Sequence, residues 1–327
     1  SFDVIVEDQE SPILHGLPVS IQIGTNTDLC GATATWAAPE AIDNCEVVDL
    51  TQTHISGDFF PVGETTVTYL VTDAAGNETS VSFAVQVTDV QGPVVTGLPG
   101  VIDAENTTGQ CGTEVTWEEP TIEDACGEVT FNASHLSGEF FPVGDNEVAY
   151  TATDSAGNVT IATFIVSVRD TELPVITSVP ENQVVVAPPG HCAAAVNWEQ
   201  PTATDNCQIT QLVTSFYSGM EYAVGTTTVI VVATDGGSNQ VTASFQITVL
   251  DEEDPEIVGV PSDLTYTSQA GVCGAFVSWI EPSGIDGCGL SSFESSHDPD
   301  SFFSVGSTVV TYVATDTSGN SVSDNFT

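Results

Sequence analysis

The sequence predicts an all-β chain of four tandem β-sandwich domains, each 81 residues long. Two observations support this prediction. The cysteines and tryptophans recur with a fixed step of 81 residues, and apolar and polar residues alternate along most segments. Alternating runs separated by glycine, proline, asparagine or aspartate about every 8–12 residues are typical of an antiparallel sandwich of about seven strands. Valine, threonine and isoleucine dominate where helix formers would otherwise be expected.

Five residues mark the repeat. Cys30, Trp36, Asp43, Cys45 and Gly63 of the first domain each recur 81, 162 and 243 residues later. The step places the domains at residues 9–89, 90–170, 171–251 and 252–327, after a terminal strand at residues 1–8 that belongs to a preceding repeat. The tryptophan of each domain is expected in its core, facing the opposite sheet, rather than on a sugar-binding platform.

The charge of the chain excludes several classes of partner. The chain has 46 acidic side chains and one basic residue, Arg169, which gives a net charge of −45. Nucleic acid is excluded, because binding phosphates needs a basic face, and anionic membranes are disfavoured for the same reason. The longest apolar run, Val229–Ala233, is too short to cross a bilayer, so no membrane insertion is expected.

Each domain holds two cysteines, always 15 residues apart. This regularity and the absence of zinc-type spacing predict one disulfide inside each domain, worth about 3 kcal/mol in the chain-entropy model. The alternative is a pair of free thiols buried in the core. Disulfides would indicate an oxidising, extracellular setting. The predicted pairs are Cys30–Cys45, Cys111–Cys126, Cys192–Cys207 and Cys273–Cys288.

Three stretches carry a family resemblance: "CGTEVTWEEPTIEDAC" (111–126), "SHLSGEFFPVGDNEVAYTATDSAGN" (134–158) and "FIVSVRDTELP" (164–174). They resemble the hyalin repeat, or HYR domain. The T-D-x-x-G-N motif is met at residues 72–77, 153–158 and 315–320, while the third domain departs with "TDGGSN". The resemblance implies an immunoglobulin-like module related to fibronectin type III, strung into elongated arrays with adhesive or matrix roles. A second cysteine pair that many hyalin repeats carry is missing here.

The segment Asp73–Asn77 and its three counterparts join two predicted strands. A plain hairpin turn accounts for it, since aspartate accepts amide hydrogen bonds and glycine supplies a positive φ. The immunoglobulin-like resemblance supports a second interpretation, because it puts this loop where the linker enters the domain. Linker and loop oxygens would then bind Ca²⁺, the one cofactor predicted, and stiffen each junction.

Asp43 would join that site only if its loop reaches the same end of the domain, and a Cys30–Cys45 bond argues against this. Both interpretations stay open at this point. The candidate calcium ligands are Asp8, Asp43, Asp73, Asn77, Asp89, Asp124, Asp154, Asn158, Asp170, Asp205, Asp235, Asn239, Asp251, Asp286, Asp316 and Asn320.

Other polar residues receive plainer interpretations. His54, His135 and His297 recur, but Phe216 replaces the histidine in the third domain, so they are expected to be loop or strand-end polar groups rather than metal ligands. Five N-x-[ST] sequons occur, some by chance, and a glycan on two of them would compete with calcium binding. The candidate glycosylation sites are Asn77, Asn106, Asn132, Asn158 and Asn325.

The sequence predicts that the chain is not an enzyme. It has no G-x-S-x-G or H-E-x-x-H motif, and each cysteine has a predicted partner. Carboxylate pairs suited to glycosidase-like chemistry are abundant. The recurring aspartates nevertheless occur in all four domains, whereas an active site is normally built once.

The residues and the resemblance together predict an extracellular or cell-surface fibre, stalk or matrix protein of calcium-stiffened domains. Its expected partners are further copies or repeats of the same protein, end to end. The alternative is a cell-surface adhesin that binds a glycan or a partner protein through its loops, with "GMEYAVG" (219–225) as the marked candidate. A third possibility is a module appended to a secreted enzyme.

The two ends of the sequence are complementary. By the 81-residue step, residues 1–8 match 82–89, and the fourth domain lacks the counterpart of Val85–Asp89. The sequence therefore predicts a stretch in register with a longer repeating polymer. Either it is taken from a longer array, or residues 1–8 of one molecule fill the open groove of the fourth domain in the next.

Overall fold

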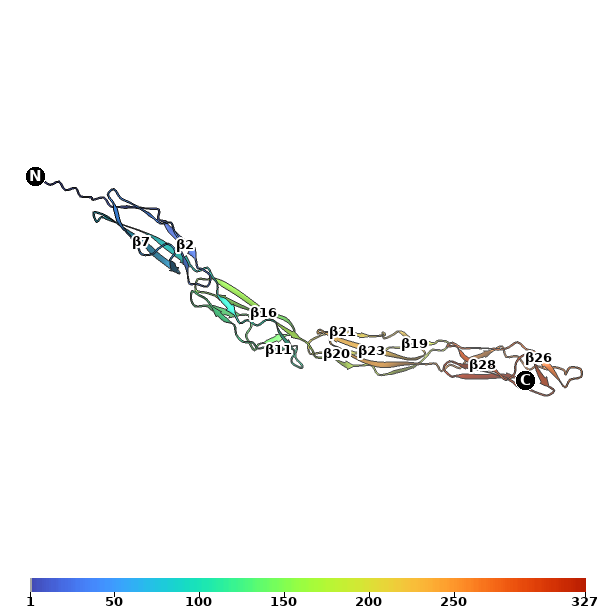
Figure 1. The fold of residues 1–327 in the computed structure, drawn as a ribbon. Coiled ribbons are helices and arrows are strands. Elements are labelled where there is room, and N and C mark those ends of the chain that lie inside the picture. The colour runs from blue at the N-terminus through green and yellow to red at the C-terminus, as the bar shows by residue number, and fades with distance from the viewer. Residues whose placement is uncertain (1) are drawn as a thin grey trace. The chain divides into compact units, whose positions relative to one another are not determined.

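The computed structural model describes residues 2–327, and all 31 regular elements in them are strands (Figure 1). The all-β prediction is confirmed. Two compact units divide the chain: the residues up to Asn106 together with Gly112–Arg169, and Thr107–Cys111 together with Asp170–Thr327. Each unit contains two of the predicted sandwiches. Nowhere in residues 2–327 is there a helix with the length and apolarity needed to cross a bilayer.

The first repeat has eight strands in three sheets. A four-stranded sheet has the order β2-β8-β7-β5, while β1 pairs with β4 and β3 pairs with β6. The hairpin β7–β8 is the longest, because its valines, tyrosine and phenylalanine alternate inward with outward threonines and serines. The strands are β1 Ile13–His15, β2 Ser20–Gly24, β3 Gly31–Thr33, β4 Glu40–Ile42, β5 Val47–Gln52, β6 Phe59–Pro61, β7 Gly63–Asp73 and β8 Glu78–Thr88.

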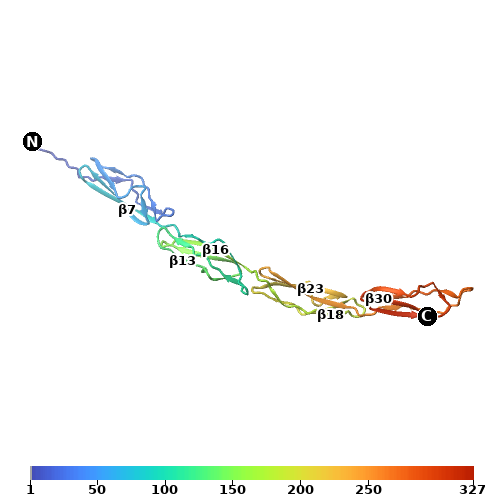
Figure 2. The same cartoon turned by 60° about the horizontal axis from the view of Figure 1, so that its bottom comes forward.

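The second and third repeats share this topology, with sheets β10-β16-β15-β13 and β18-β24-β23-β21. Figure 2 shows β18 and β23 from a second side. The second repeat has β9 Val94–Thr96, β10 Ile102–Glu105, β11 Gly112–Glu114, β12 Thr121–Glu123, β13 Thr130–Ala133, β14 Phe140–Pro142, β15 Gly144–Thr153 and β16 Val159–Arg169. The third has β17 Val175–Ser178, β18 Gln183–Val186, β19 Ala193–Ala195, β20 Thr202–Thr204, β21 Ile209–Thr214, β22 Glu221–Ala223, β23 Gly225–Asp235 and β24 Gln240–Leu250.

One strand pair in each four-stranded sheet is parallel, which differs from the antiparallel sandwich that we predicted. β2 runs alongside β8 from Ser20↔Ala84 to Gly24↔Thr88. β1 and β2 follow one another without a hairpin, and between them the chain crosses from a two-stranded sheet to the large sheet. Because no hairpin reverses the chain between β1 and β2, β2 enters the large sheet parallel to β8.

The core lies between the four-stranded sheet and the two small sheets. In the first repeat Phe60, Val67 and Val85 are fully buried, and Trp36 packs against this cluster, which confirms its predicted core position. Trp36 Nε1 donates a hydrogen bond to Tyr69 Oη at 2.9 Å. Equivalent bonds occur in the second and fourth repeats. In the third, Val231 replaces the tyrosine, and Trp198 Nε1 is buried with no acceptor among residues 2–327.

The recurring histidines cover a core aromatic ring. His54 lies 5.1 Å from Phe60 between ring centroids, and the other two histidines pack in the same way on the equivalent phenylalanines. Phe216 takes this position on Tyr222 at 5.8 Å. Either a histidine or a phenylalanine ring can cover the core ring at this position. Packing therefore explains why an aromatic residue recurs here better than a polar role alone.

The fourth repeat has a smaller sheet, with the order β28-β30-β31. β30 starts at Val310, although β7 starts at the counterpart of Gly306, and residues 263–267 form no strand where β2 would lie. A groove of about 580 Å³ lies beside this sheet. The strands are β25 Glu256–Val258, β26 Gly274–Val277, β27 Ser283–Ile285, β28 Leu290–Ser295, β29 Ser301–Ser304, β30 Val310–Asp316 and β31 Ser321–Phe326.

Of the terminal strand predicted at residues 1–8, residues 2–8 form no strand in the structure. Ser1 lies outside the described residues, and residues 2–12 have no regular structure. Phe2, Val4 and Val6 are 89%, 76% and 90% exposed. A strand is stable only beside a partner, and residues 2–8 pair with no strand of the described chain.

Candidate metal centre at the joints between repeats

Disulfides join successive repeats instead of closing each one. Every bonded pair is 96 residues apart, and the Cα–Cα distances of 4.6–5.0 Å suit a disulfide. Cys45 and Cys273 are free and exposed. The predicted pairs Cys30–Cys45, Cys111–Cys126, Cys192–Cys207 and Cys273–Cys288 are therefore wrong. The bonds are Cys30–Cys126, Cys111–Cys207 and Cys192–Cys288.

The two cysteines of one repeat lie at opposite ends of the sandwich, which is why they do not pair. Cys30 follows a turn beside Thr88, at what we call the far end, whereas Cys45 lies near Asp8 at the linker end. β7 runs between these ends, and its 11 residues span roughly 35 Å. A disulfide needs Cα atoms within about 7 Å. A joint is the far end of one repeat together with the linker end of the next.

The Asp73–Asn77 loop holds the linker at this end. Asp73 Oδ1 accepts from the amides of Ala75 and Asn77, and Asp73 Oδ2 accepts from Asn77 Nδ2 at 2.7 Å. Asn77 Nδ2 also donates to the carbonyls of Asp8 and Glu10, at 3.3 and 3.1 Å. We call this arrangement the latch. It recurs at Asp154–Asn158 and Asp235–Asn239, and at Asp316–Asn320 with a bond to one linker carbonyl, that of Asp251.

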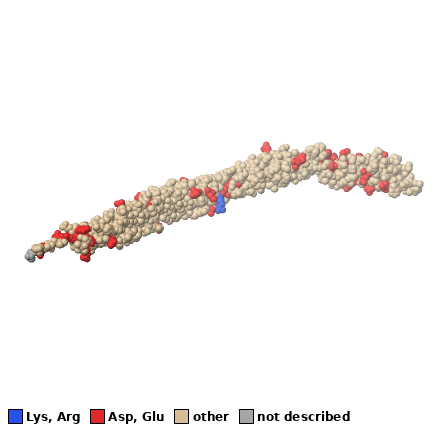
Figure 3. All heavy atoms as spheres, turned by 90° about the horizontal axis from the view of Figure 1, so that it is seen from above, with Lys and Arg blue, Asp and Glu red and all other residues tan. Residues whose placement is uncertain are grey.

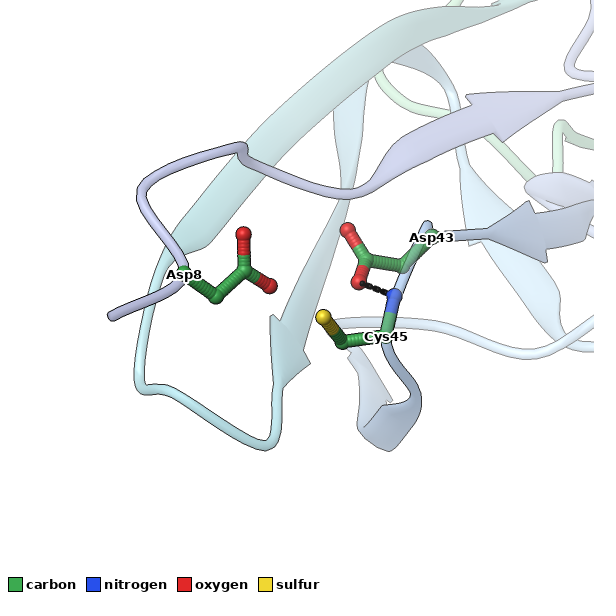
Figure 4. Close-up of side chains that lie close together, drawn as sticks. All are labelled: Asp8, Asp43 and Cys45. Carbon is green, nitrogen blue, oxygen red and sulfur yellow. Dashed lines mark hydrogen bonds between the residues drawn. The ribbon is translucent and has the colours of Figure 1, made fainter. Parts of the chain in front are cut away.

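A second group of predicted ligands forms a carboxylate pair next to each latch. Asp8 on the linker and Asp43 on the loop after β4 point towards each other and towards Cys45 (Figure 4). Asp43 thus reaches the linker end, because no bond to Cys30 holds it away. Their ligand atoms lie within 4.8 Å, as do those of the pairs Asp89–Asp124, Asp170–Asp205 and Asp251–Asp286.

The far end of the preceding repeat is tied to the same linker. Gln91 Nε2 donates to Thr25 Oγ1, and the Asp28 amide donates to Gln91 Oε1 at 2.9 Å. In the second and third joints Glu172 and Glu253 accept from the amides of Gly109 and Gly190, at 2.7 and 2.6 Å. Each joint therefore combines a disulfide, a latch, a side-chain tie and a carboxylate pair.

Buried oxygens in these pairs lack donors. Asp89 and Asp170 are each 6% exposed, and the Oδ2 atom of each is buried with no hydrogen bond from residues 2–327. In the joint that contains the Cys111–Cys207 bond, Asp205 Oδ1 and Asn206 Oδ1 are also buried and receive no hydrogen bond from the described residues. Unpaired buried carboxylate oxygens are costly, so these clusters are the candidate places for a cation.

Comparison with known proteins identifies the repeats. A model of the HYR domain matches residues 7–87, 88–168, 169–249 and 250–327. The chain belongs to the HYR domain family. This confirms the resemblance seen in the sequence, with boundaries two residues before those predicted for the first three repeats.

Two hyalins are similar to this HYR chain. Hyalin of Lytechinus variegatus is 37% identical over 306 residues, which cover 89% of this chain and 57% of that protein. Hyalin of Strongylocentrotus purpuratus is 34% identical over 342 residues and 100% of this chain. The chain spans only 28% of the latter. Among solved structures, protocadherin gammaB7 EC3-6 aligns with 94% of this chain and 98% of its own at 14% identity and a TM-score of 0.31.

Hydrogen bonds lower the pKa of three latch carboxylates, those of Asp73, Asp154 and Asp316. Burial raises the pKa of Asp73, but hydrogen bonds from Asn77 and the loop amides outweigh it and hold the pKa below its ordinary 3.8. The pKa values of Asp154 and Asp316 are lowered in the same way. At Cys45 a hydrogen bond to Asp8, burial and neighbouring carboxylates raise the thiol pKa. Both oxygens of each latch carboxylate are occupied, so the carboxylate pairs are the stronger candidates for a cation.

The latches also bear on the sequons. The Nδ2 atoms of Asn77 and Asn158 are part-buried donors to linker carbonyls, a role that an attached glycan would disturb. Asn132 and Asn325 are exposed on strands, so a glycan there meets no such conflict, and Asn106 is half-buried.

Some residues of the joint were missed by sequence reasoning. Asn206, Gln91 and the two glutamates that replace Gln91 were not singled out. A signal was present: the residue two positions after each linker aspartate is Glu10, Gln91, Glu172 or Glu253, always a long side chain with a terminal oxygen. Asn206 does not recur in every repeat, because alanine and glycine occupy its position in the second and fourth repeats, so the repeat pattern does not single it out.

Proposed function

We propose that this chain is an extracellular structural protein whose HYR repeats are fixed in succession by joints, each combining a disulfide with a calcium ion. The observation that carries the proposal is the coincidence, in one joint, of a bond such as Cys111–Cys207 with buried carboxylate oxygens that lack donors. Three disulfides also support an extracellular location, because they persist in oxidising compartments. Recurrence of the site supports a structural rather than an enzymatic role.

The donor atoms fit calcium better than a softer metal. Asp170, Asp205 and Asn206 offer oxygens, and the Cys207 sulfur is bonded in a disulfide, so it is no thiolate ligand. Calcium–oxygen bonds of about 2.3–2.6 Å place two ligands of one ion up to about 5 Å apart. The 4.8 Å limit on the paired atoms agrees with this spacing. Bound Ca²⁺ would neutralise the pair and tie the linker to the loop after β20.

The third joint offers a weaker site. There the Ser318 hydroxyl donates to Asp251 Oδ2 at 3.1 Å, an oxygen whose counterparts in Asp89 and Asp170 have no donor. The joints therefore differ in the free energy that a bound cation would contribute, because an oxygen that already accepts a hydrogen bond has less to gain from a metal. We expect the joints at Asp89 and Asp170 to bind calcium more tightly than the joint at Asp251.

The surrounding charge favours the same chemistry. The chain has 46 acidic side chains, and the only basic group seen in Figure 3 is Arg169, whose exposed guanidinium lies 3.5 Å from Asp103. A cation site in so negative a chain gains from long-range attraction as well as from its ligands. Salt weakens this part of the attraction, because exposed charges are screened.

Calcium is expected to stabilise the protein and to bind at the joints. At a free calcium concentration one hundred times the dissociation constant, binding adds about 2.7 kcal/mol to the stability of the site-bearing unit. Isothermal titration calorimetry and thermal unfolding, with and without EDTA, measure the two effects. Asp205→Asn should remove one tight binding event, because it keeps the acceptor for the Cys207 amide while removing the charge.

Asp254→Asn is the matched control. Asp254 is exposed, and this substitution changes the net charge by the same amount as Asp205→Asn. It should leave the number of tight sites unchanged. Equal loss of binding in both variants would show that calcium is only a diffuse counterion. Identical calorimetry and melting temperatures with and without EDTA would rule out the calcium part of the proposal.

An exposed patch on the third repeat favours a second candidate function, adhesion through a loop. Tyr217 is 71% exposed and Met220 43%, whereas the equivalents of Met220 in the other repeats are Asp58, Glu139 and Ser301. The Tyr222 hydroxyl donates to the Tyr217 carbonyl at 3.2 Å, which steadies the loop. An exposed aromatic ring on a steady loop suits stacking against a sugar or a protein side chain.

Binding to a glycan array is therefore expected to depend on this ring. Tyr217→Ala should remove binding, and Leu136→Ala, at the same position of the second repeat, should not. Array signals that survive Tyr217→Ala, or none with the unmodified chain, would reject sugar binding by this loop.

A further inference from the structure

The outer face of the large sheet in the third repeat carries no charge. This sheet has the order β18-β24-β23-β21, and its inner face covers the core while its outer face meets solvent. The strand registers put Val184, Thr226 and Thr248 in one outward row. Asp235, the one acidic residue on these four described strands, is 1% exposed and belongs to the latch. We call the outer surface of β18, β21, β23 and β24 the neutral face.

The first repeat has carboxylates on the equivalent face. They are Asp49 on β5, Glu64 on β7 and Glu78 on β8, and all three are exposed. The third repeat has at these positions Gln211, Thr226 and Gln240. Each carboxylate is thus replaced by an uncharged polar side chain.

The second repeat also has carboxylates on this face. They include Asp103 and Glu105 on β10 and Glu147 on β15, which are exposed. The third repeat has at these positions Val184, Val186 and Thr228. The replacements extend over all four strands of the large sheet, so the lack of charge belongs to the whole face and not to one strand.

Apolar side chains contribute much of the neutral face. Val184 is 66% exposed, Ile230 47% and Val213 42%. Thr226 Oγ1 and Thr248 Oγ1 form a hydrogen bond with each other at 3.1 Å, so part of the hydroxyl hydrogen bonding is satisfied within the face. Covering this surface would therefore remove apolar area from water at a small cost in lost hydroxyl hydration.

A second copy of this chain is the partner that such a face suits. A basic partner would be attracted to the carboxylates of the other repeats, and not to a face without charge. A copy carries the same net charge of −45, so the two molecules repel each other wherever their carboxylates meet. Two neutral faces can meet without this repulsion. Because the same surface would serve on both molecules, the contact closes as a two-fold dimer.

We propose that two molecules associate side by side, with the neutral faces of their third repeats packed against each other. β23 and β24 run between the linker end and the far end of the repeat, so the neutral face lies along its side. Sheets stacked face to face lie about 10 Å apart. Strands of 11 residues and a width of four strands give a contact of roughly 500 Å² per molecule.

A contact of this size is weak. Stable complexes bury about 1,200–2,000 Å² in total, whereas two neutral faces would bury roughly 1,000 Å². The contact would therefore matter between molecules that are already held close together, where the effective concentration is high. The inference goes beyond the calcium joint, uses none of its ligands and does not depend on bound calcium.

Sedimentation velocity of the full chain, from about 10 μM to about 1 mM, tests the association. The thiols of Cys45 and Cys273 are alkylated first, so that disulfide-linked multimers do not contribute. We expect a reversible equilibrium between monomer and dimer. A chain that stays monomeric up to about 1 mM overturns the proposal.

Thr228→Glu should weaken the dimer by about tenfold or more, because the two-fold contact would bury two added carboxylates. The third repeat should still fold, since Thr228 is exposed and Glu147 occupies its position in the second repeat. Thr66→Glu is the matched control, because it makes the same substitution at the same, exposed position of the first repeat. It should leave the dimer unchanged. Equal dissociation constants for the two variants would overturn the role of the neutral face.

Val184→Asp distinguishes packing of the faces from pairing of the sheet edges. β18 is an edge strand, so two copies could instead pair through their β18 strands. Edge pairing would be weakened by Val184→Asp but not by Thr228→Glu, whereas face packing is weakened by both. The second repeat has Asp103 at this position, so an aspartate there is compatible with the fold. A dimer that only Val184→Asp weakens would contradict packing of the faces.

Salt and chelation separate this contact from the calcium joints. The remaining surfaces of the two chains repel each other, so the dimer should tighten between about 0.05 M and about 0.5 M NaCl as this repulsion is screened. EDTA at the higher salt concentration should leave the dissociation constant unchanged. A dimer that EDTA dissociates would be bridged by calcium, which would overturn this inference without counting against calcium in the joints.

Discussion

Replacing Cys30 and Cys126 together by serine should lower the free energy of unfolding of the first unit by about 4–5 kcal/mol. In the chain-entropy model, cross-linking a loop of about 100 residues is worth about 4.7 kcal/mol, and this pair is 96 residues apart. Native-state hydrogen exchange of the β7 and β15 amides measures the loss. It reports the first unit separately from the second.

Cys45→Ser is the matched control, because it removes a cysteine that has no disulfide partner in this chain. It should leave exchange rates unchanged. If peptide mapping found a Cys30–Cys45 bond, or if Cys45→Ser were as destabilising as the double variant, the joint disulfide would be contradicted.

Asp73→Ala should destabilise the first repeat by about 3 kcal/mol. Asp73 is 1% exposed, and its loss leaves the amides of Ala75 and Asn77 without their acceptor and frees the Asn77 side chain that holds the linker. Hydrogen exchange at β7, β8 and residues 8–10 measures both effects. The second, third and fourth repeats should be unaffected, because each has its own latch.

Asp49→Ala is the control, since Asp49 is exposed on β5, and it should change the stability by less than about 0.5 kcal/mol. Acid gives an independent readout. A lowered pKa in the folded state means that the latch contributes its stability above the ordinary aspartate pKa and loses it as pH falls through the lower, folded value. The exchange difference between Asp73→Ala and the unmodified chain should therefore persist at neutral pH and shrink below about pH 4.

The fold was largely predictable, whereas the disulfide partners were not. Alternation along Val67, Tyr69 and Val71 indicates a strand with one buried face, and the structure buries these side chains. A strictly periodic sequence gives no such help with cysteines. A spacing of 15 residues inside one repeat and of 96 between neighbours follow from the same 81-residue step. Only the positions of Cys30 and Cys45 at opposite ends of the sandwich decide between them.

The candidate site was predicted in part, for a similar reason. Sequence reasoning put Asp8, Asp73 and Asn77 in one region and left the place of Asp43 open, and the structure brings all four to the linker end. It did not separate their roles, because an asparagine offers both a donor and an acceptor. The Asn77 amide donates to linker carbonyls, a contact between two segments 67–69 residues apart that no local pattern reveals.

The overlap of the three disulfide loops limits how far the chain can be stretched. A pull between Cys30 and Cys288 is carried through the three bonds and the two short segments 111–126 and 192–207. Those segments extend to roughly 105 Å in all, at about 3.5 Å per residue. Without the bonds, the same stretch of backbone would extend to roughly 900 Å. Even with every sandwich unfolded, the protein would stop lengthening early, so it would behave under tension as a tether of nearly constant length, unlike arrays of separately closed domains that lengthen as each one unfolds.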